Sequence, residues 1–201
     1  MSDLTLSRIR SVLLAKPKRI LPPGPGRTLA CVAVVLAGAP ERPNVCLIRR
    51  AEQAGDPWSG HMALPGGRAE TFDATAEAVA ERETAEEVGL RLRPENLIAP
   101  LAEMPVRASG RDMLMTLAAF VYSLEGTPPP LVLQKVEVAQ ALWVPLEQVY
   151  DPASRTRYRF NRNGASLDFP GVSLEGHTVW GLTYRVLSEL GDRLGLPLPQ
   201  E

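Results

Sequence analysis

The chain has few cysteines, and both of them lie in apolar surroundings. Cys31 belongs to the run L-A-C-V-A-V-V-L and Cys46 to the run V-C-L-I. A buried free thiol is the usual state of a cysteine in such a run, and a disulfide or a shared metal ion is the less common alternative. This usage argues against a disulfide-stapled scaffold and indicates a reducing compartment.

The chain also lacks a strong net charge and a long apolar run. Its formal net charge is −1 and its pI is about 6.2, so long nucleic acid polymers are poor candidates as partners, whereas small anionic ligands remain open. No run of about 18 apolar residues occurs, and residues 1–10 carry charge without the apolar stretch of a signal peptide. We therefore expect a cytoplasmic protein without a membrane span.

The length and composition suit one domain with an extension. The chain has 201 residues, of which 45% are hydrophobic, and this is enough for a sizeable core. Leu6, Ile9 and Leu13 have helical spacing, and this short helix ends before K-P-K-R and the stiff segment L-P-P-G-P-G. We therefore divide the chain into an N-terminal helix and proline-rich arm over residues 1–27 and a domain over residues 28–196.

Apolar periodicity predicts an α+β fold for the domain. The expected elements are, in chain order, strands at about 28–37 and 45–49 that form a hairpin, a helix at 74–88, strands at 97–104, 113–124 and 141–144, a helix start at 145–149, and a C-terminal helix from Leu182 to Leu194. Periodicity alone allows several α+β arrangements.

The most informative segment is the run R-E-T-A-E-E within the helix at 74–88. Glu83 and Glu87 fall roughly 40° apart on a helical wheel, and Glu86 lies about 60° further round, still on the near side, so we expect the three carboxylates to converge where the helix meets its core. The first two share a face with the apolar residues Ala76, Val79 and Ala80, where a solvated helix would not place carboxylates. Two carboxylates roughly 4 Å apart repel by about 4 kcal/mol at an effective dielectric near 20, and a divalent cation removes this cost. Oxygen ligands select hard ions, so we expect Mg²⁺ or Mn²⁺.

Both ends of this helix are specified by the sequence. Asp73 suits the N-cap, and Gly89 suits the left-handed residue after the last turn. Gly66 and Gly67 end the preceding strand and let the backbone approach an ion or a phosphate closely. Arg82 lies four residues before Glu86, so that its guanidinium can hold one carboxylate while others bind a metal.

This segment resembles the box of the Nudix hydrolases, G-x5-E-x7-R-E-U-x-E-E-x-G-U, in which U is aliphatic. Thr84 stands at the first U, Asp73 replaces the first glutamate, and eight residues rather than seven separate it from Arg82. An aspartate with one extra residue is similar to the coenzyme A pyrophosphatase branch of the family. The matched positions are Gly67, Arg82, Glu83, Glu86, Glu87, Gly89 and Leu90.

Two further segments resemble that branch. The run E-G-H-T-V-W-G-L-T near the C-terminus is similar to its C-terminal segment, although we expect Trp180 and Val179 to be core residues and His177 to be an ordinary hydrogen-bonded side chain. The upstream run L-I-R-R-A-E-Q-A-G-D-P-W-S-G-H-M-A-L-P-G-G keeps Arg50 but has Asp56 where the branch pattern has a second arginine. An aspartate there would repel the 3′-phosphate of coenzyme A.

The resemblance implies an α/β/α sandwich with a mixed sheet and a catalytic loop-helix-loop. It also implies metal ligation by Glu83, Glu86, Glu87 and the Gly66 carbonyl, with Arg82 as a further catalytic residue. Glu137 lies six residues before Trp143, where some members place an additional catalytic or metal-binding glutamate, and a solvated loop carboxylate is the equal alternative.

Other residues are candidates for substrate binding. Arg49, Arg50 and Arg107 would bind phosphate, and Gly67 would let the backbone approach it. Trp58 would stack on a base or another flat ring, or would only shape its loop. His61 next to it would bind phosphate or relay a proton, although a structural role is the expected one.

The activity that the resemblance implies is metal-dependent hydrolysis of a pyrophosphate bond in a small, nucleotide-derived compound. In the coenzyme A branch, coenzyme A or an acyl derivative is cut to 3′,5′-ADP and 4′-phosphopantetheine. A second enzymatic alternative is a hydrolase for ADP-ribose, dinucleotides or nucleoside triphosphates. A third is a ligand-sensing module without turnover, which the complete R-E-x-x-E-E set disfavours. The sequence leaves the oligomeric state open.

Overall fold

The computed structural model describes residues 4–23, 26, 28–55, 58–107, 114–134, 136–162 and 165–200. Of these, Arg107, Leu114, Arg162 and Ala165 are described by their backbone alone. The helices are α1 (Leu6–Ala15), α2 (Ala76–Val88), α3 (Leu146–Tyr150) and α4 (Gly181–Leu194), with short 3-10 turns at Pro94–Asn96 and Pro152–Ser154. The strands are β1 (Thr28–Ala39), β2 (Arg42–Arg50), β3 (Met62–Ala63), β4 (Gly66–Arg68), β5 (Leu97–Arg107), β6 (Leu114–Leu124), β7 (Val138–Pro145), β8 (Arg155–Arg162), β9 (Ala165–Leu174) and β10 (His177–Trp180).

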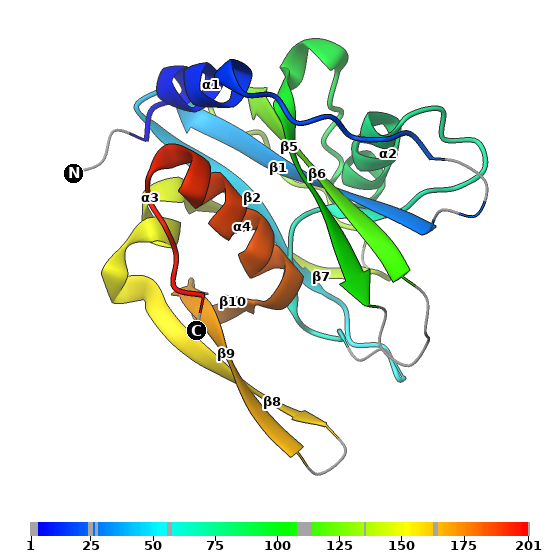
Figure 1. Ribbon diagram of the computed structural model, residues 1–201, viewed down its shortest axis with the longest axis vertical. Coiled ribbons are helices and arrows are strands. Elements are labelled where there is room, and N and C mark those ends of the chain that lie inside the picture. The colour runs from blue at the N-terminus through cyan, green and yellow to red at the C-terminus, as the bar shows by residue number, and fades with distance from the viewer. Residues whose placement is uncertain are drawn as a thin grey trace.

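A seven-stranded mixed sheet forms the centre of the molecule (Figure 1). Its strand order is β3-β2-β1-β6-β5, with β4 added to β1 and β7 added to β2. The predicted hairpin of β1 and β2 is confirmed, and β1 pairs in parallel with β6 while its other pairings are antiparallel. These elements confirm the predicted α+β fold with a mixed sheet.

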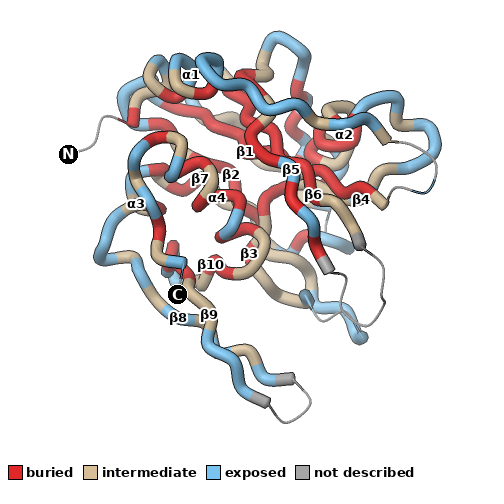
Figure 2. Tube along the Cα trace, in the orientation of Figure 1, coloured by how far each residue is buried: buried red, intermediate tan, exposed pale blue. Residues whose placement is uncertain are grey.

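The two faces of the sheet are covered by different helices. Along β1, even-numbered residues from Ala30 to Leu36 pack with α1 and α4, and odd-numbered residues from Leu29 to Val35 pack with α2. This alternation follows from the two-residue repeat of a strand, which makes β1 apolar on both sides because both sides are covered. Figure 2 shows the buried residues concentrated along the central strands.

Helix α1 packs into the core beside α4, although the two helices lie near opposite ends of the sequence. Its apolar residues Ile9 and Leu13 are fully buried, and Arg8 donates to the carbonyl oxygen of Leu194 over 2.9 Å. Cys31 and Cys46 are buried free thiols, as predicted, and burial raises the pKa of Cys46 to about 12. None of the helices in the described part of the chain has the length and apolar character needed to span a bilayer.

The sequence analysis missed a second, three-stranded sheet of order β10-β9-β8, whose β8–β9 hairpin extends from the body (Figure 1). Strand β8 reads R-T-R-Y-R-F-N-R, in which arginine alternates with other residues, and this two-residue repeat is the signal that could have revealed it. Glu175 and Gly176 have φ values of 49° and 79° and join β9 to β10, as a two-residue hairpin turn requires.

Candidate active site

Strand β4, which precedes α2, brings two glycines against the carboxylates of that helix. Gly66 has φ 152°, and a Cβ there would lie 2.2 Å from the carbonyl oxygen of Cys31. A Cβ on Gly67 would lie 2.3 Å from the carboxyl carbon of Glu83. Position 66 therefore requires glycine, since a side chain there would push the backbone away from β1. A side chain at position 67 would instead displace the carboxylate of Glu83.

The N-cap of helix α2 is Thr75 and not Asp73, so the predicted N-cap is wrong. The Thr75 hydroxyl accepts the backbone N–H of Ala78 over 3.1 Å. The Asp73 carboxylate instead accepts from the Arg82 guanidinium, with Nε 3.1 Å from Oδ1 and one terminal nitrogen 3.0 Å from Oδ2. A bidentate, charge-assisted pair is stronger than a single cap hydrogen bond, which explains why Asp73 turns toward Arg82. Gly89 caps the other end in the left-handed conformation, with φ 73°, as predicted.

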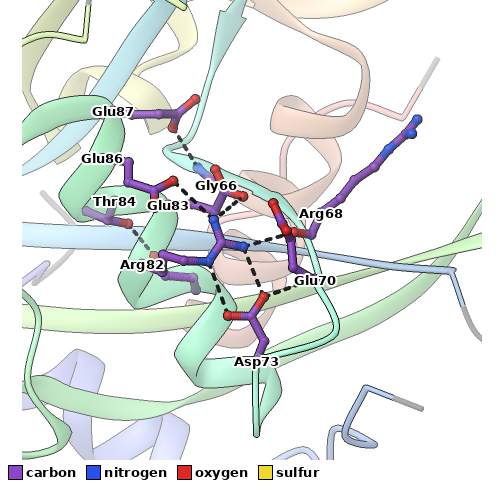
Figure 3. Close-up of polar contacts among 10 residues, drawn as sticks. Gly66, Arg68, Glu70, Asp73, Arg82, Glu83, Thr84, Glu86 and Glu87 are labelled. Carbon is purple, nitrogen blue, oxygen red and sulfur yellow. Dashed lines mark hydrogen bonds and ion pairs between the residues drawn. The ribbon is translucent and has the colours of Figure 1, made fainter. Parts of the chain in front are cut away.

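Four carboxyl groups, those of Asp73, Glu83, Glu86 and Glu87, form a group that we call the acidic cluster (Figure 3). Arg82 holds the first three of them together. Besides Asp73, it donates to Glu83 over 2.9 Å, to Glu86 over 3.1 Å and to the carbonyl oxygen of Arg68 over 3.1 Å. The pair with Asp73 lowers the pKa of that carboxyl. Arg82 therefore fixes the carboxylates of α2 relative to the loop that precedes it, as its spacing from Glu86 predicted.

Glu87 is the most deeply buried glutamate of α2. It is 3% exposed, and one of its oxygens accepts the backbone N–H of Gly66 over 2.9 Å (Figure 3). Burial raises its pKa to about 8, and the charges of Glu83 and Glu137 add to this rise. Burial likewise raises the pKa of Glu83, against the lowering effect of Arg82. The fold thus collects negative charge in a place where water does not compensate it.

Glu86 does not lie on the core side of α2, so the prediction that all three carboxylates converge there is wrong for this residue. Its side chain is 57% exposed and is held at the surface by Arg82. Within the described residues, no three acidic, histidine or cysteine side chains already have a geometry that would hold a metal ion. Arg82 accounts for this, because its guanidinium occupies oxygens of both Glu83 and Glu86.

The loop that carries Glu137 is fastened to the end of α2. The backbone N–H groups of Val132 and Gln134 donate to the carbonyl oxygens of Val88 and Glu87, each over 3.0 Å. The carbonyl oxygen of Glu137 accepts the N–H of Ala51 over 2.8 Å, which links this loop to the end of β2. Because the charge of Glu137 raises the pKa of both Glu83 and Glu87, its carboxylate lies within electrostatic reach of the cluster.

The arginines that we expected to bind phosphate lie in different parts of the structure. Arg50 lies near Glu87, and its positive charge partly offsets the rise in the pKa of Glu87. Arg50 also lines a cavity that Gly66 and Gly67 border. Arg49 forms an ion pair with Glu52, with 4.0 Å between the charged atoms, and a bulge in β2 separates it from Arg50. The side chain of Arg107 and all of Asp56 lie outside the described residues. Arg68 extends away from the carboxylates in Figure 3.

Trp58 and His61 belong to a group of aromatic rings that we call the aromatic cluster. Its members are Trp58, His61, Tyr158, Phe160, Phe169 and Trp180. Tyr158 stacks on Trp180 with ring centroids 4.1 Å apart, and its hydroxyl lies 3.2 Å from Nε2 of His61. Trp58 is 39% exposed. The sequence analysis missed Tyr158 and Phe160 because it missed the strand that carries them.

The C-terminal segment packs as expected. Val179 is fully buried and Trp180 is 6% exposed. Nε2 of His177 lies 3.1 Å from Oε1 of Gln140, so it is a hydrogen-bonded side chain, as predicted. Thr84, at a position that is aliphatic in the resembled motif, is buried and donates its hydroxyl to the carbonyl oxygen of Ala80.

Comparison with known proteins gives the family context. Residues 27–163, more than half of the chain, match the family model of the NUDIX domain. The chain is 40% identical over 126 residues to an uncharacterized protein of Schizosaccharomyces pombe, covering 61% of this chain and 38% of that protein. It therefore spans well under half the length of that relative. It is also 28% identical over 181 residues to the uncharacterized Nudix hydrolase NudL of Photorhabdus laumondii, covering 87% and 91% of the two chains.

Solved structures show the same fold. A MutT/nudix family protein from Enterococcus faecalis aligns with a TM-score of 0.59 and 16% identity, covering 95% of this chain and 70% of that one. The NUDIX domain of NrtR from Shewanella oneidensis, which was crystallised with ADP ribose, aligns with a TM-score of 0.50 and 20% identity, covering 69% and 84% of the two chains.

Proposed function

The chain belongs to the Nudix family of pyrophosphohydrolases, and we propose that it hydrolyses the pyrophosphate bond of coenzyme A or a related nucleoside diphosphate derivative at the acidic face of α2. The observation that carries the proposal is Glu87, a carboxyl that is 3% exposed beside Glu83 and Glu137 and hydrogen-bonded to the backbone of Gly66. A fold gains nothing from burying carboxylates together unless a cation compensates them.

The residues of the cluster fit a hard divalent cation, for which we propose Mg²⁺ or Mn²⁺. Glu83, Glu86 and Glu87 offer oxygen ligands only, and the Gly66 carbonyl is a further candidate ligand. The raised pKa of Glu87 fits this assignment, because it reports a desolvated carboxyl without enough positive charge around it. Bound there, the cation would neutralise phosphate charge and lower the pKa of a coordinated water.

Side chains of the protein would position the metal ligands and the substrate's phosphates. Arg82 holds Glu83 and Glu86 in place through hydrogen bonds of 2.9 and 3.1 Å. Arg50 would compensate phosphate charge next to Glu87. Water attacks one phosphorus in line, the bridging P–O bond breaks and the second phosphate leaves. A glutamate of α2 or Glu137 would accept the proton of the attacking water.

Coenzyme A is our first choice of substrate because of the eight-residue spacing after Asp73 and the W-G-L-T run. The relatives named above do not identify the substrate. ADP-ribose is the second candidate, because Asp56 opposes a 3′-phosphate and because the NrtR domain binds ADP ribose within the same fold. A ligand-sensing module is disfavoured by the complete set of carboxylates on α2.

The substrate is tested by comparing coenzyme A with 3′-dephospho-coenzyme A at equal Mg²⁺ concentration. We expect kcat/KM for the two compounds to agree within about threefold, since a charge-assisted contact to the 3′-phosphate would be worth about 1.5–3 kcal/mol, or roughly ten- to a hundredfold. A strong preference for the 3′-phosphorylated form would show that Arg49, Arg50 or Arg107 recognises this phosphate. Cleavage of neither compound, with turnover of ADP-ribose, would overturn the coenzyme A assignment.

A further inference from the structure

A cavity of about 450 Å³ adjoins the acidic cluster on the other side of β4, the strand that carries Gly66 and Gly67. Gly66 and Gly67 form part of its wall, while the same two residues contact Glu87 and Glu83. A group that fills the cavity is therefore separated from the carboxylates by these two glycines. The cavity lies between the central sheet and α4, since Val32 and Leu117 line it from strands and Leu182 and Val186 line it from the helix.

The wall of the cavity is mainly apolar. Aliphatic side chains and methionines come from β1, β3, β6 and α4, and the indole rings of Trp58 and Trp180 also line the cavity. Among the lining residues that the structure describes, the charged, hydroxyl or imidazole side chains are Arg50, His61, Arg68 and Thr183. The Thr183 hydroxyl donates to the carbonyl oxygen of Met62 over 3.3 Å, and His61 contacts the Tyr158 hydroxyl. Apart from the guanidinium groups of Arg50 and Arg68, few side chains of the wall are left to pair with the polar edge of a ligand.

The backbone of the wall is also occupied. Residues 30–32 of β1 pair with β4 on one edge and with β6 on the other, so their N–H and C=O groups are taken up by the sheet. A nucleobase placed in the cavity would leave several donors and acceptors unpaired, and each would lose its hydrogen bonds to water. An aliphatic group loses no hydrogen bond there and gains from burial.

We propose that this cavity is a subsite for an aliphatic group esterified to the substrate's phosphate, so that the apolar half of the substrate enters the cavity and the nucleoside half stays outside it. The inference rests on the proposed function, because it takes the acidic face of α2 as the place of the phosphates. Arg50, which borders the cavity, lies at the junction where a phosphate ester meets the alkyl group.

The test uses phosphate monoesters, which contain no pyrophosphate bond and report binding without turnover. Butyl phosphate, hexyl phosphate, ribose 5-phosphate and adenosine 5′-monophosphate are titrated into the full chain by calorimetry with Mg²⁺ present. Each buried methylene adds roughly fourfold in affinity. We expect hexyl phosphate to bind at least about fivefold more tightly than butyl phosphate and about tenfold more tightly than ribose 5-phosphate, with a negative heat-capacity change.

Leu182→Trp provides the matched variant, since the larger ring would fill the cavity from the half-buried start of α4. It should reduce the hexyl-to-butyl affinity ratio to about one, whereas Leu14→Trp, on the exposed face of α1, should leave this ratio unchanged. Circular dichroism and thermal unfolding verify that each variant folds.

Two results would overturn the inference. One is a hexyl-to-butyl ratio below about two in the wild-type protein. The other is tight binding of adenosine 5′-monophosphate that competes with hexyl phosphate and disappears in Leu182→Trp, which would put the base in the cavity. Failure of the proposed hydrolase activity is distinguishable, because the chain-length dependence of binding would then persist without cleavage of any pyrophosphate compound.

Discussion

Replacing Glu87 by glutamine is expected to lower kcat/KM at saturating Mg²⁺ by about a thousandfold or more while the protein stays folded. The side chain keeps its shape and can still accept the Gly66 N–H, but it loses the negative charge that a metal ligand needs. Glu77→Gln is the matched control, because it makes the same change in the first turn of the same helix. A Glu87→Gln protein that keeps more than about a tenth of the wild-type rate would contradict direct metal ligation.

The same substitution should stabilise the metal-free protein at alkaline pH. The pKa of Glu87 is raised to about 8 from its ordinary value of 4.5, so between these values the folded state holds a proton that the unfolded chain has released. The free energy of unfolding of the wild-type protein therefore falls as pH rises from about 4.5 through 8, and Glu87→Gln lacks this fall. At pH 9 in EDTA we expect the variant to be more stable by at least about 1 kcal/mol, or roughly 2–4 °C in Tm. Equal Tm values at pH 9 and at pH 5 would count against a desolvated carboxyl.

Glu137→Gln should reduce kcat by about a hundredfold with little change in KM. The loop bearing Glu137 is held by hydrogen bonds to α2 and β2, and its charge reaches Glu83 and Glu87, so its carboxylate can act as a base or a metal ligand in the transition state. Glu125→Gln, at an exposed position, makes the same chemical change and should keep wild-type kinetics. If Glu137→Gln is also kinetically normal, the base must be one of the glutamates of α2.

The sequence predicted the centre of the site because the restraints there are local. Glu83 and Glu87 are four residues apart on one helix, Arg82 reaches Glu86 over one turn, and Gly89 ends that helix, so helical geometry alone relates these residues. The sequence also predicted the strands β1 and β2, because a strand that is buried on both faces needs a continuous apolar run.

Other features depend on contacts that spacing does not reveal. Asp73 turns from the helix end to Arg82 because a charged partner outweighs a cap that Thr75 can supply. The exposure of Glu86 follows from the same guanidinium. Tyr158 meets His61 across 97 positions in sequence, and only the folding of β8 against the loop at residue 61 brings them together.

We propose that the acidic face of α2 binds a divalent cation and that the protein cleaves a pyrophosphate bond there. The most direct measurement incubates the protein with coenzyme A, ADP-ribose, a dinucleotide and a nucleoside triphosphate, in H₂¹⁸O, with Mg²⁺ or with EDTA, and identifies the products by mass spectrometry. We expect phosphomonoester products from at least one compound, with ¹⁸O in one product phosphate. These products should depend on Mg²⁺ and should be absent with Glu87→Gln. Intact substrates throughout, or cleavage that persists in EDTA, would contradict this proposal.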